Sequence, residues 1–214
     1  MPLSNLKIAV VMFSVMLLTI HPLLSQEDTV IKPYHLGVQV GMNASRVAGT
    51  SFSGINKVGI YTSAFIIRDV NQKLALEFNL SYSQKGTLKP PNHKQNDYTK
   101  YLMKLAYSEL CVIGRYKHKS GIYYDAGLGV GYLLQALETD ENNQTITSNG
   151  EFRKMEFSAI VGIQFPISNR IEIGARGSHS ILPIRKHING ATFRFNRGQL
   201  NQVLSFTLRY TIKE

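Results

Sequence analysis

The chain has 214 residues, of which 43% are hydrophobic and 18% charged, a composition that is ordinary for one globular domain. Its only cysteine, Cys111, excludes an internal disulfide, so no disulfide holds the fold even in an oxidising compartment. The formal net charge of +10 alone would suit nucleic acid, but the membrane-spanning pattern described below argues against that partner.

The N-terminus has the pattern of a secretory signal peptide. A short basic region, residues 1–7, precedes the apolar run of residues 8–20, which is too short to cross a membrane as a helix. We expect residues 1–25 to be removed near Ser25 or Gln26, which leaves residues 26–214 as a single domain. The alternative is an uncleaved N-terminal anchor. No cysteine directly follows the run, so a bacterial lipoprotein is excluded.

Eight segments of alternating apolar and polar residues follow the signal. They span residues 35–45, 57–68, 73–85, 103–117, 121–136, 153–167, 170–180 and 199–212. The clearest is residues 74–86, LALEFNLSYSQKG, where alternate residues from Leu74 to Tyr82 are apolar. A soluble strand averages about five or six residues, whereas a tilted strand crossing a bilayer needs roughly 9 to 11. The length of this pattern therefore predicts membrane-spanning strands.

The two faces of these segments differ in the same way along the chain. In residues 121–136 the face with Leu128 and Val130 is apolar, whereas the other carries Asp125 and three glycines. Residues 57–68 are ambiguous, because Tyr61 and Phe65 lie opposite Ile60, Ala64 and Ile66. A soluble lipocalin-like barrel would turn its apolar face inward around a ligand. Here the charged face is the one predicted to point inward.

The connections alternate in length. Residues 69–72, 117–120 and 166–169 are turn-like, whereas residues 46–56, 86–102, 137–152 and 181–198 are long. Outer-membrane barrels have short periplasmic turns and long extracellular loops. The sequence therefore predicts an all-β protein, an eight-stranded antiparallel transmembrane up-and-down β-barrel, in the outer membrane of a Gram-negative bacterium.

Two of these segments resemble strands of the PorT-type outer-membrane β-barrel family. The first match comprises Leu74, Glu77, Phe78, Tyr82, Ser83, Gln84, Lys85 and Gly86, with Phe78 where leucine is usual. The second comprises Tyr107, Glu109, Arg115 and Tyr116, while Ser108 and Cys111 depart from the pattern. The resemblance covers the expected mature chain and implies a barrel of the porin-family type in the outer membrane. It also permits a role in a protein secretion pathway.

Charged residues on the inward faces must share a narrow lumen, because an eight-stranded barrel is just wide enough for its own side chains. We expect them to form a network of ion pairs that plugs the lumen, since unpaired buried ions are costly. This predicted network comprises Glu77, Glu109, Arg115, Asp125, Glu172, Arg176 and Arg209. A narrow ion channel is the alternative reading of the same residues.

Other basic residues lie near the predicted extracellular loops. An outer leaflet rich in lipid phosphates, such as those of lipopolysaccharide, would attract them. We expect lipid-phosphate contacts from Lys85, Lys89, Arg185, Lys186, Arg194 and Arg197. Protein partners are expected at the loops or at the periplasmic turns.

The sequence contains no P-loop, nucleophile elbow or zinc motif, so we expect no cofactor and no enzymatic activity. The protein is then a structural, interaction or secretion-accessory component. Ser178, His179 and Ser180 keep open the alternative of a lipid-modifying enzyme, although no acid lies nearby for a triad. A calcium site in the third long loop is a further alternative, because Glu138, Asp140 and Glu141 could supply carboxylate ligands.

Aromatic residues should mark the two membrane interfaces, where tyrosine and phenylalanine are favoured. The expected periplasmic ring comprises Tyr34, Phe65, Tyr116, Tyr124, Phe165 and Tyr210. The expected outer ring comprises Tyr82, Tyr132 and Phe157.

Overall fold

The structure is a computed structural model that describes residues 34–49, 57–91, 99–140, 142, 144–146, 150–186 and 198–213. The expected signal peptide lies outside these residues. The chain forms eight strands: β1 (His35–Ala48), β2 (Lys57–Asp69), β3 (Leu74–Lys89), β4 (Tyr101–Lys117), β5 (Tyr123–Thr139), β6 (Met155–Pro166), β7 (Ile171–Ser180) and β8 (Leu200–Lys213).

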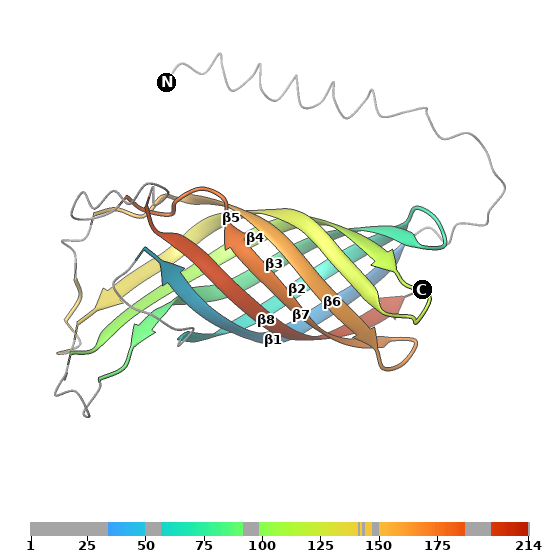
Figure 1. Cartoon of the computed structure of the whole chain (residues 1–214), viewed down its shortest axis with the longest axis horizontal. Helices are drawn as coiled ribbons and strands as arrows, with labels where there is room; N and C mark the ends of the chain where they lie inside the picture. Colours follow the sequence, from blue (N-terminus) through green and yellow to red (C-terminus); the bar gives the residue numbers. More distant parts are fainter. Residues whose placement is uncertain are drawn as a thin grey trace, which may run out of the picture. The chain divides into compact units, whose positions relative to one another are not determined.

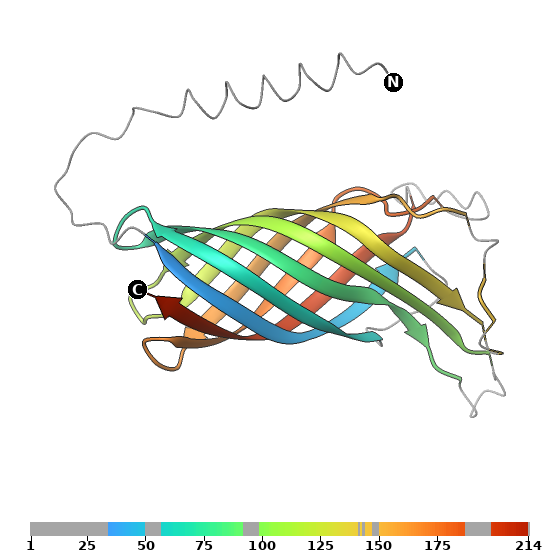
Figure 2. The same ribbon diagram turned by 180° about the vertical axis from the view of Figure 1, so that it is seen from behind.

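Each strand pairs antiparallel with the next, and β8 pairs with β1 to close the barrel (Figures 1 and 2). Closure is in register over most of both strands, with Val40 opposite Leu208 and Ala44 opposite Leu204. The strands are 10 to 17 residues long, enough to cross a bilayer at a tilt. The predicted eight-stranded antiparallel barrel is confirmed. No helix among the residues described here is long and apolar enough to span a membrane.

Short turns lie at one end of the barrel and long connections at the other, hereafter the turn end and the loop end (Figure 1). The turn after β2 is held by Asn71, whose Oδ1 accepts hydrogen bonds from the backbone N–H groups of Lys73 and Leu74 at 2.9 and 2.8 Å. Ser168 holds the turn after β6 in the same manner, through Arg170 and Ile171. Such local side-chain bonds favour tight turns, and tight turns fix strand register.

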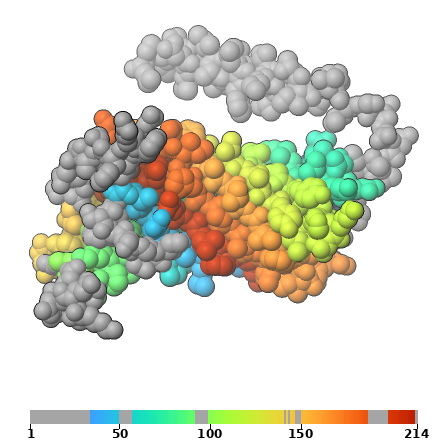
Figure 3. Space-filling view, viewed as in Figure 1, coloured from blue at the N-terminus to red at the C-terminus, as the bar shows by residue number. Residues whose placement is uncertain are grey.

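The outer surface of the barrel is apolar. Leu80, Leu128, Val161 and Phe206 are among the many large apolar side chains left exposed on their strands. Figure 3 shows the outer side chains over β7 and β8, in orange and red, as a continuous surface. An exposed apolar surface of this extent is what a lipid-facing wall requires.

The ambiguity of β2 is resolved by a phenylalanine in the lumen. Ile60 and Ile66 are exposed, whereas Tyr61 and Phe65 are buried. The ring of Phe65 lies directly over Gly37 of β1, where an added Cβ would come within 2.2 Å of it. The guanidinium of Arg209 stacks on the same ring at 4.0 Å from its centroid. Placing Phe65 in the periplasmic aromatic ring was therefore wrong, because Gly37 leaves space for its ring inside the barrel.

The other aromatic residues of the two expected rings lie on the outside of the barrel, fully or partly exposed. These are Tyr34, Tyr82, Tyr116, Tyr124, Tyr132, Phe157, Phe165 and Tyr210.

A β-bulge in β5 changes which residues face inward near the loop end. Tyr107 of β4 pairs with Leu133, but the preceding Ala106 pairs with Gln135, so Leu134 is an extra residue. One inserted residue reverses the alternation that follows it. Before the bulge the odd-numbered residues of β5, such as Asp125, point into the barrel. After it the even-numbered Glu138 does so.

An apolar cluster fills the loop end of the lumen. It comprises Val47, Met103, Leu105, Tyr107, Leu133 and Ile184. Ile184 comes from the segment after β7, which folds back over the barrel and bonds to Arg153 and Gln199 through its backbone.

Candidate functional site

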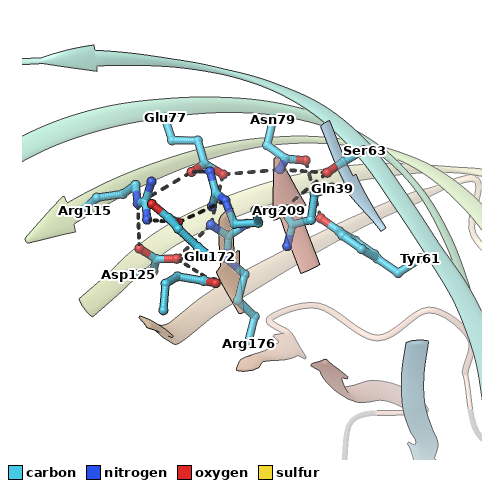
Figure 4. A network of polar contacts seen from close by, with 11 residues as sticks. Gln39, Tyr61, Ser63, Glu77, Asn79, Arg115, Asp125, Glu172, Arg176 and Arg209 are labelled. Atoms are coloured by element: carbon cyan, nitrogen blue, oxygen red, sulfur yellow. Dashed lines mark hydrogen bonds and ion pairs between the residues drawn. The ribbon is translucent and has the colours of Figure 1, made fainter. Parts of the chain in front are cut away.

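The most organised group of side chains is a cluster of ions in the turn-side half of the lumen, hereafter the inner cluster (Figure 4). It joins five strands and comprises Glu77 (β3), Arg115 (β4), Asp125 (β5), Glu172 and Arg176 (β7), and Arg209 (β8). Alternation places each of them on the inward face of its strand, and the barrel radius brings them together.

Glu77 is the hub of the inner cluster. Arg176 donates from Nη2 to its Oε1 at 3.0 Å, and Arg209 donates from Nη2 to its Oε2 at 2.7 Å. A third guanidinium, that of Arg115, lies 3.8 Å away. The carboxylate is fully buried, so these cations replace the water that would otherwise solvate it.

Asp125 connects two of the same arginines from the opposite side. Its Oδ2 accepts from Nε and Nη2 of Arg176 at 3.0 and 2.8 Å, and its Oδ1 accepts from Nε of Arg115 at 3.2 Å. Gln164 donates a further hydrogen bond at 3.2 Å. Two nitrogens of one guanidinium on one carboxylate oxygen hold the side chains in a fixed relative orientation.

Glu172 completes the cluster at its turn-side edge. It accepts from Nη2 of Arg115 at 2.7 Å and forms an ion pair with Arg209 at 3.4 Å. Three carboxylates therefore face three guanidiniums, and the inner cluster is neutral. A pocket of about 250 Å³ opens at the turn end and reaches Arg115 and Glu172, where the cluster begins.

Glu109 is buried in the lumen and ion-paired, as expected, but it belongs to a second group that is separate from the inner cluster. Its partner across β3 is Ser81, four residues from Glu77, which is about 13 Å along a strand. There Lys85 bridges Glu109 at 2.5 Å and Glu156 at 3.2 Å. Glu156 also accepts hydrogen bonds from Ser180 and Asn201.

Lys85 was expected to contact lipid phosphates, and the structure places it in the lumen instead. Its side chain is only 2% exposed. β3 continues to Lys89, so the alternation that turns Glu77 inward also turns Lys85 inward. Two carboxylates neutralise the Lys85 ammonium inside the barrel, and its burial keeps it away from lipid.

Arg185 differs from expectation for another reason. The segment after β7 folds back, and Arg185 forms two hydrogen bonds of 2.8 Å with Glu138 and one of 3.0 Å with Gln199. Its guanidinium also lies over the ring of Phe152. Burial alone would lower the pKa of Arg185, but the hydrogen bonds and charge of Glu138 raise it. Arg185 therefore fastens the segment to the barrel and does not reach lipid.

The remaining residues of the expected lipid contacts are placed differently again. Lys89 is half-buried at the end of β3 and hydrogen-bonds to Thr99. Lys186 is exposed. Arg194 and Arg197 lie outside the described residues.

The residues considered for chemistry do not converge. Ser180 points into the lumen and donates to Glu156 at 2.5 Å, whereas the neighbouring His179 is exposed on the outer face. Ser178 lies half-buried two positions before Ser180. Neighbours on a strand point to opposite sides, so His179 cannot act on Ser180. Cys111 is buried among lumen side chains.

Metal ligands are also dispersed. The part of the chain that the structure describes contains no group of three or more histidine, cysteine or acidic side chains able to hold a metal. Of the residues considered for calcium, Glu138 lies in β5 and is paired with Arg185. Asp140 accepts hydrogen bonds from the backbone N–H groups of Asn142 and Gln144. Glu141 lies outside the described residues.

Glu156 is the functional residue that sequence reasoning missed. Alternation already placed it on the inward face of its strand, but its partner Lys85 was assigned to the outside. The sequence places Lys85, Glu109 and Glu156 on the inward faces of their strands near the loop end. Their opposite charges and shared face would have predicted that they pair.

Comparison with known proteins identifies the family. The model of the outer membrane protein beta-barrel domain matches residues 24–185. Comparison with curated proteins gives no significant match.

A solved structure has the same fold, and a second is less similar. The crystal structure of neisserial surface protein A has 12% identity and a TM-score of 0.51, with 84% of this chain and 97% of that chain covered. Ail, the attachment invasion locus protein of Yersinia pestis, has 13% identity and a TM-score of 0.47, with 84% and 99% covered. Since the family model covers well over half of its length, the chain belongs to the outer membrane protein beta-barrel domain family.

Proposed function

We propose that the protein is a non-enzymatic component of the outer membrane whose barrel is closed to solutes and serves as a structural, interaction or secretion-accessory element. The observation that carries this proposal is the neutral inner cluster, in which side chains of five strands neutralise one another. A pore or an active site needs charged groups that a solute can reach. The charged groups of the inner cluster are instead paired with one another.

The second barrier to transport is apolar. A solute that passed the inner cluster would next meet Lys85 and its two carboxylates, and then the apolar cluster around Leu105 and Ile184. Dewetted apolar constrictions stop ions because no polar group replaces their hydration. Two closures of different chemistry in series favour a sealed barrel over a narrow ion channel.

The PorT-type resemblance supports the secretion-accessory form of this proposal. A sealed barrel contributes to secretion through its loops or turns, by holding a protein partner at the membrane. In this proposal the turn end faces the periplasm and the loop end faces the medium. Residues 1–25 direct export and are removed.

Planar bilayer recording tests the sealed barrel. We expect the purified protein to show no conductance above that of the bare bilayer. As a matched positive control, a variant with Met103→Gly, Leu105→Gly and Arg176→Gly should conduct, because it removes side chains from both barriers. Steady conductance of the unmodified protein at neutral pH would contradict the proposal.

The non-enzymatic part requires a separate experiment. Lipid A from membranes with and without the protein should have the same acyl chains and phosphates. A change in lipid A that depends on His179, tested with His179→Ala, would establish the lipid-modifying alternative. Crosslinking in cells, followed by pull-down of the protein, would identify a partner bound at the loops or turns.

A further inference from the structure

The wall of the barrel contains a seam near the loop end, between β2 and β3. Hydrogen-bonded pairing between these strands stops at Tyr61 and Ser83. On their other edges both strands continue, β2 with β1 as far as Lys57 and β3 with β4 as far as Lys89. Residues 57–60 and 84–87 therefore face each other without a ladder (Figure 2).

Side chains occupy the seam and satisfy part of its open backbone. Asn43 donates from Nδ2 to the backbone carbonyl of Gln84 at 3.0 Å. The side chain of Gln84 donates to the hydroxyl of Tyr82 at 3.1 Å and accepts from the backbone N–H of Ile60 at 3.4 Å. Since an unpaired strand edge is otherwise a liability, these bonds mark the seam as a built feature.

A pocket of about 250 Å³ lies at this seam. Tyr82 and Gln84 belong to the outward face of β3, and Lys104 is exposed on β4. The pocket is lined by Lys57, Tyr82, Gln84, Lys104, Gln135 and Leu137, among others. Buried Lys85, Leu105 and Ala106 line the same pocket from within. The pocket therefore enters the wall at the seam, and Tyr82, Gln84 and Lys104 line it on the outer face.

The pocket carries positive charge that the described residues do not neutralise. Lys57 and Lys104 both line the pocket, and Nζ of Lys57 donates a hydrogen bond to the backbone carbonyl of Val58. No carboxylate in the ranges that the structure covers forms an ion pair with either. Lys85, which reaches the same wall from inside, is already neutralised by Glu109 and Glu156. Like charges held together without an acid favour an anion as the missing partner.

We propose that this pocket binds the phosphate group of an outer-leaflet lipid. Two ammonium groups, the Tyr82 hydroxyl and the amides of Gln84 and Gln135 supply donors of the kind that phosphate oxygens accept. The neighbouring Val58 and Ile60 are exposed apolar side chains, positioned to contact acyl chains. Phosphate and apolar chain are joined in a lipid, and this pairing distinguishes a lipid from free phosphate.

The test compares lipid A with its dephosphorylated form as probes. The protein is refolded in detergent, and binding is measured by native mass spectrometry. The variant Lys57→Gln with Lys104→Gln should bind phosphorylated lipid A at least about tenfold more weakly, since two charge-assisted hydrogen-bond donors are lost. The control, Lys73→Gln with Lys119→Gln, makes the same change in net charge at exposed sites of the turn end and should bind as the unmodified protein does.

Three results would overturn the proposal: equal affinity of the pocket variant and the unmodified protein, equal affinity for dephosphorylated lipid A, or complete competition by inorganic phosphate. The last would identify free phosphate as the ligand. A heat-dependent shift in gel mobility shows whether each variant is folded, and only folded variants are compared. If the double variant does not fold, the single change Lys104→Gln on the exposed face of β4 should still weaken binding of phosphorylated lipid A measurably. Unchanged binding by that variant would refute the site.

Discussion

The two halves of the lumen are closed by opposite means. The turn side is filled by ions, with Glu77 as the hub of three guanidiniums. The loop side is filled mainly by apolar side chains, among them Met103 and Leu105, with the Arg185–Glu138 ion pair beside them. Between them Lys85 joins two carboxylates. The difference teaches that a barrel of one radius can be filled either by paired charges or by apolar side chains.

The two fillings should respond differently to mutation. An ion cluster is destabilised most when its balance of charge is broken, because the remaining ion stays buried. An apolar cluster is destabilised in proportion to the volume removed. Five variants test this difference, and the single substitutions among them run from the largest expected effect to the smallest.

Removing one guanidinium from the inner cluster should have the largest effect. Arg176→Met leaves Asp125 and Glu77 short of one cation, and breaking a buried ion pair in this manner costs about 3 to 5 kcal/mol. The free energy of unfolding in urea, or the temperature of the heat-dependent gel shift, reports the loss. Lys119→Met, on an exposed turn residue, is the control and should cost little. Equal stability of both variants would refute the buried cluster.

A second variant sharpens the first. Adding Asp125→Asn to Arg176→Met removes one charge of each sign and restores neutrality. The double-mutant cycle should show a favourable coupling of about 0.5 to 3 kcal/mol, as interacting residues do. Strict additivity would mean that charge balance does not organise this half of the lumen.

Truncation in the apolar cluster should come next. Leu105 is buried beside Met103 and Ile184, and Leu105→Ala should cost about 2 to 5 kcal/mol through lost burial and a cavity. The same urea titration measures it, and Leu110→Ala on the lipid-facing surface of β4 serves as the control. If added salt changes the cost of Leu105→Ala, the loop half is not held by apolar contacts alone.

The fastening of the segment after β7 should produce a smaller, local effect. Arg185→Met leaves Glu138 without its two guanidinium bonds, and one such loss costs about 1 to 3 kcal/mol. The expected readout is faster proteolysis of residues 181–186 while the barrel remains folded. Lys186→Met, an exposed neighbour, should leave the proteolysis rate unchanged. Identical rates in both variants would contradict the fastening.

Cys111 gives the smallest effect and a check on the face assignment. It is 5% exposed, and the substitution Cys111→Ala should cost only about 1 kcal/mol, near the centre of measured single-substitution effects. A maleimide should react with the unmodified protein only after the barrel is unfolded. Rapid labelling of the folded protein would place the thiol on the outside.

Alternation in the sequence was sufficient to predict the strands and most of the inner cluster. Glu77, Asp125, Arg176 and Arg209 each lie on an inward face that can be read from their apolar neighbours. The ambiguity of residues 57–68 could not be resolved locally, because it depends on Phe65 packing over Gly37 of another strand. Register between strands decided that case.

The errors came from treating nearness to a loop as nearness to lipid. Lys85 obeyed the alternation of its own strand, which extends further than expected. The position of Arg185 could not be predicted without knowing that its segment folds back over the barrel. The inward position of Glu138 depends on the bulge at Leu134, and a single inserted residue is not visible in an apolar pattern.

The position of Glu77 also bears on how the barrel assembles. Its arginine partners lie 99 and 132 residues later in the chain, on the last two strands. An isolated first half of the barrel, β1 to β4, would offer this carboxylate only the guanidinium of Arg115, at 3.8 Å. Ion pairing and the joining of β1 to β8 must therefore occur together, since such distant contacts form only when the loop between them closes. Partly built barrels are thereby disfavoured, and assembly becomes an all-or-none event.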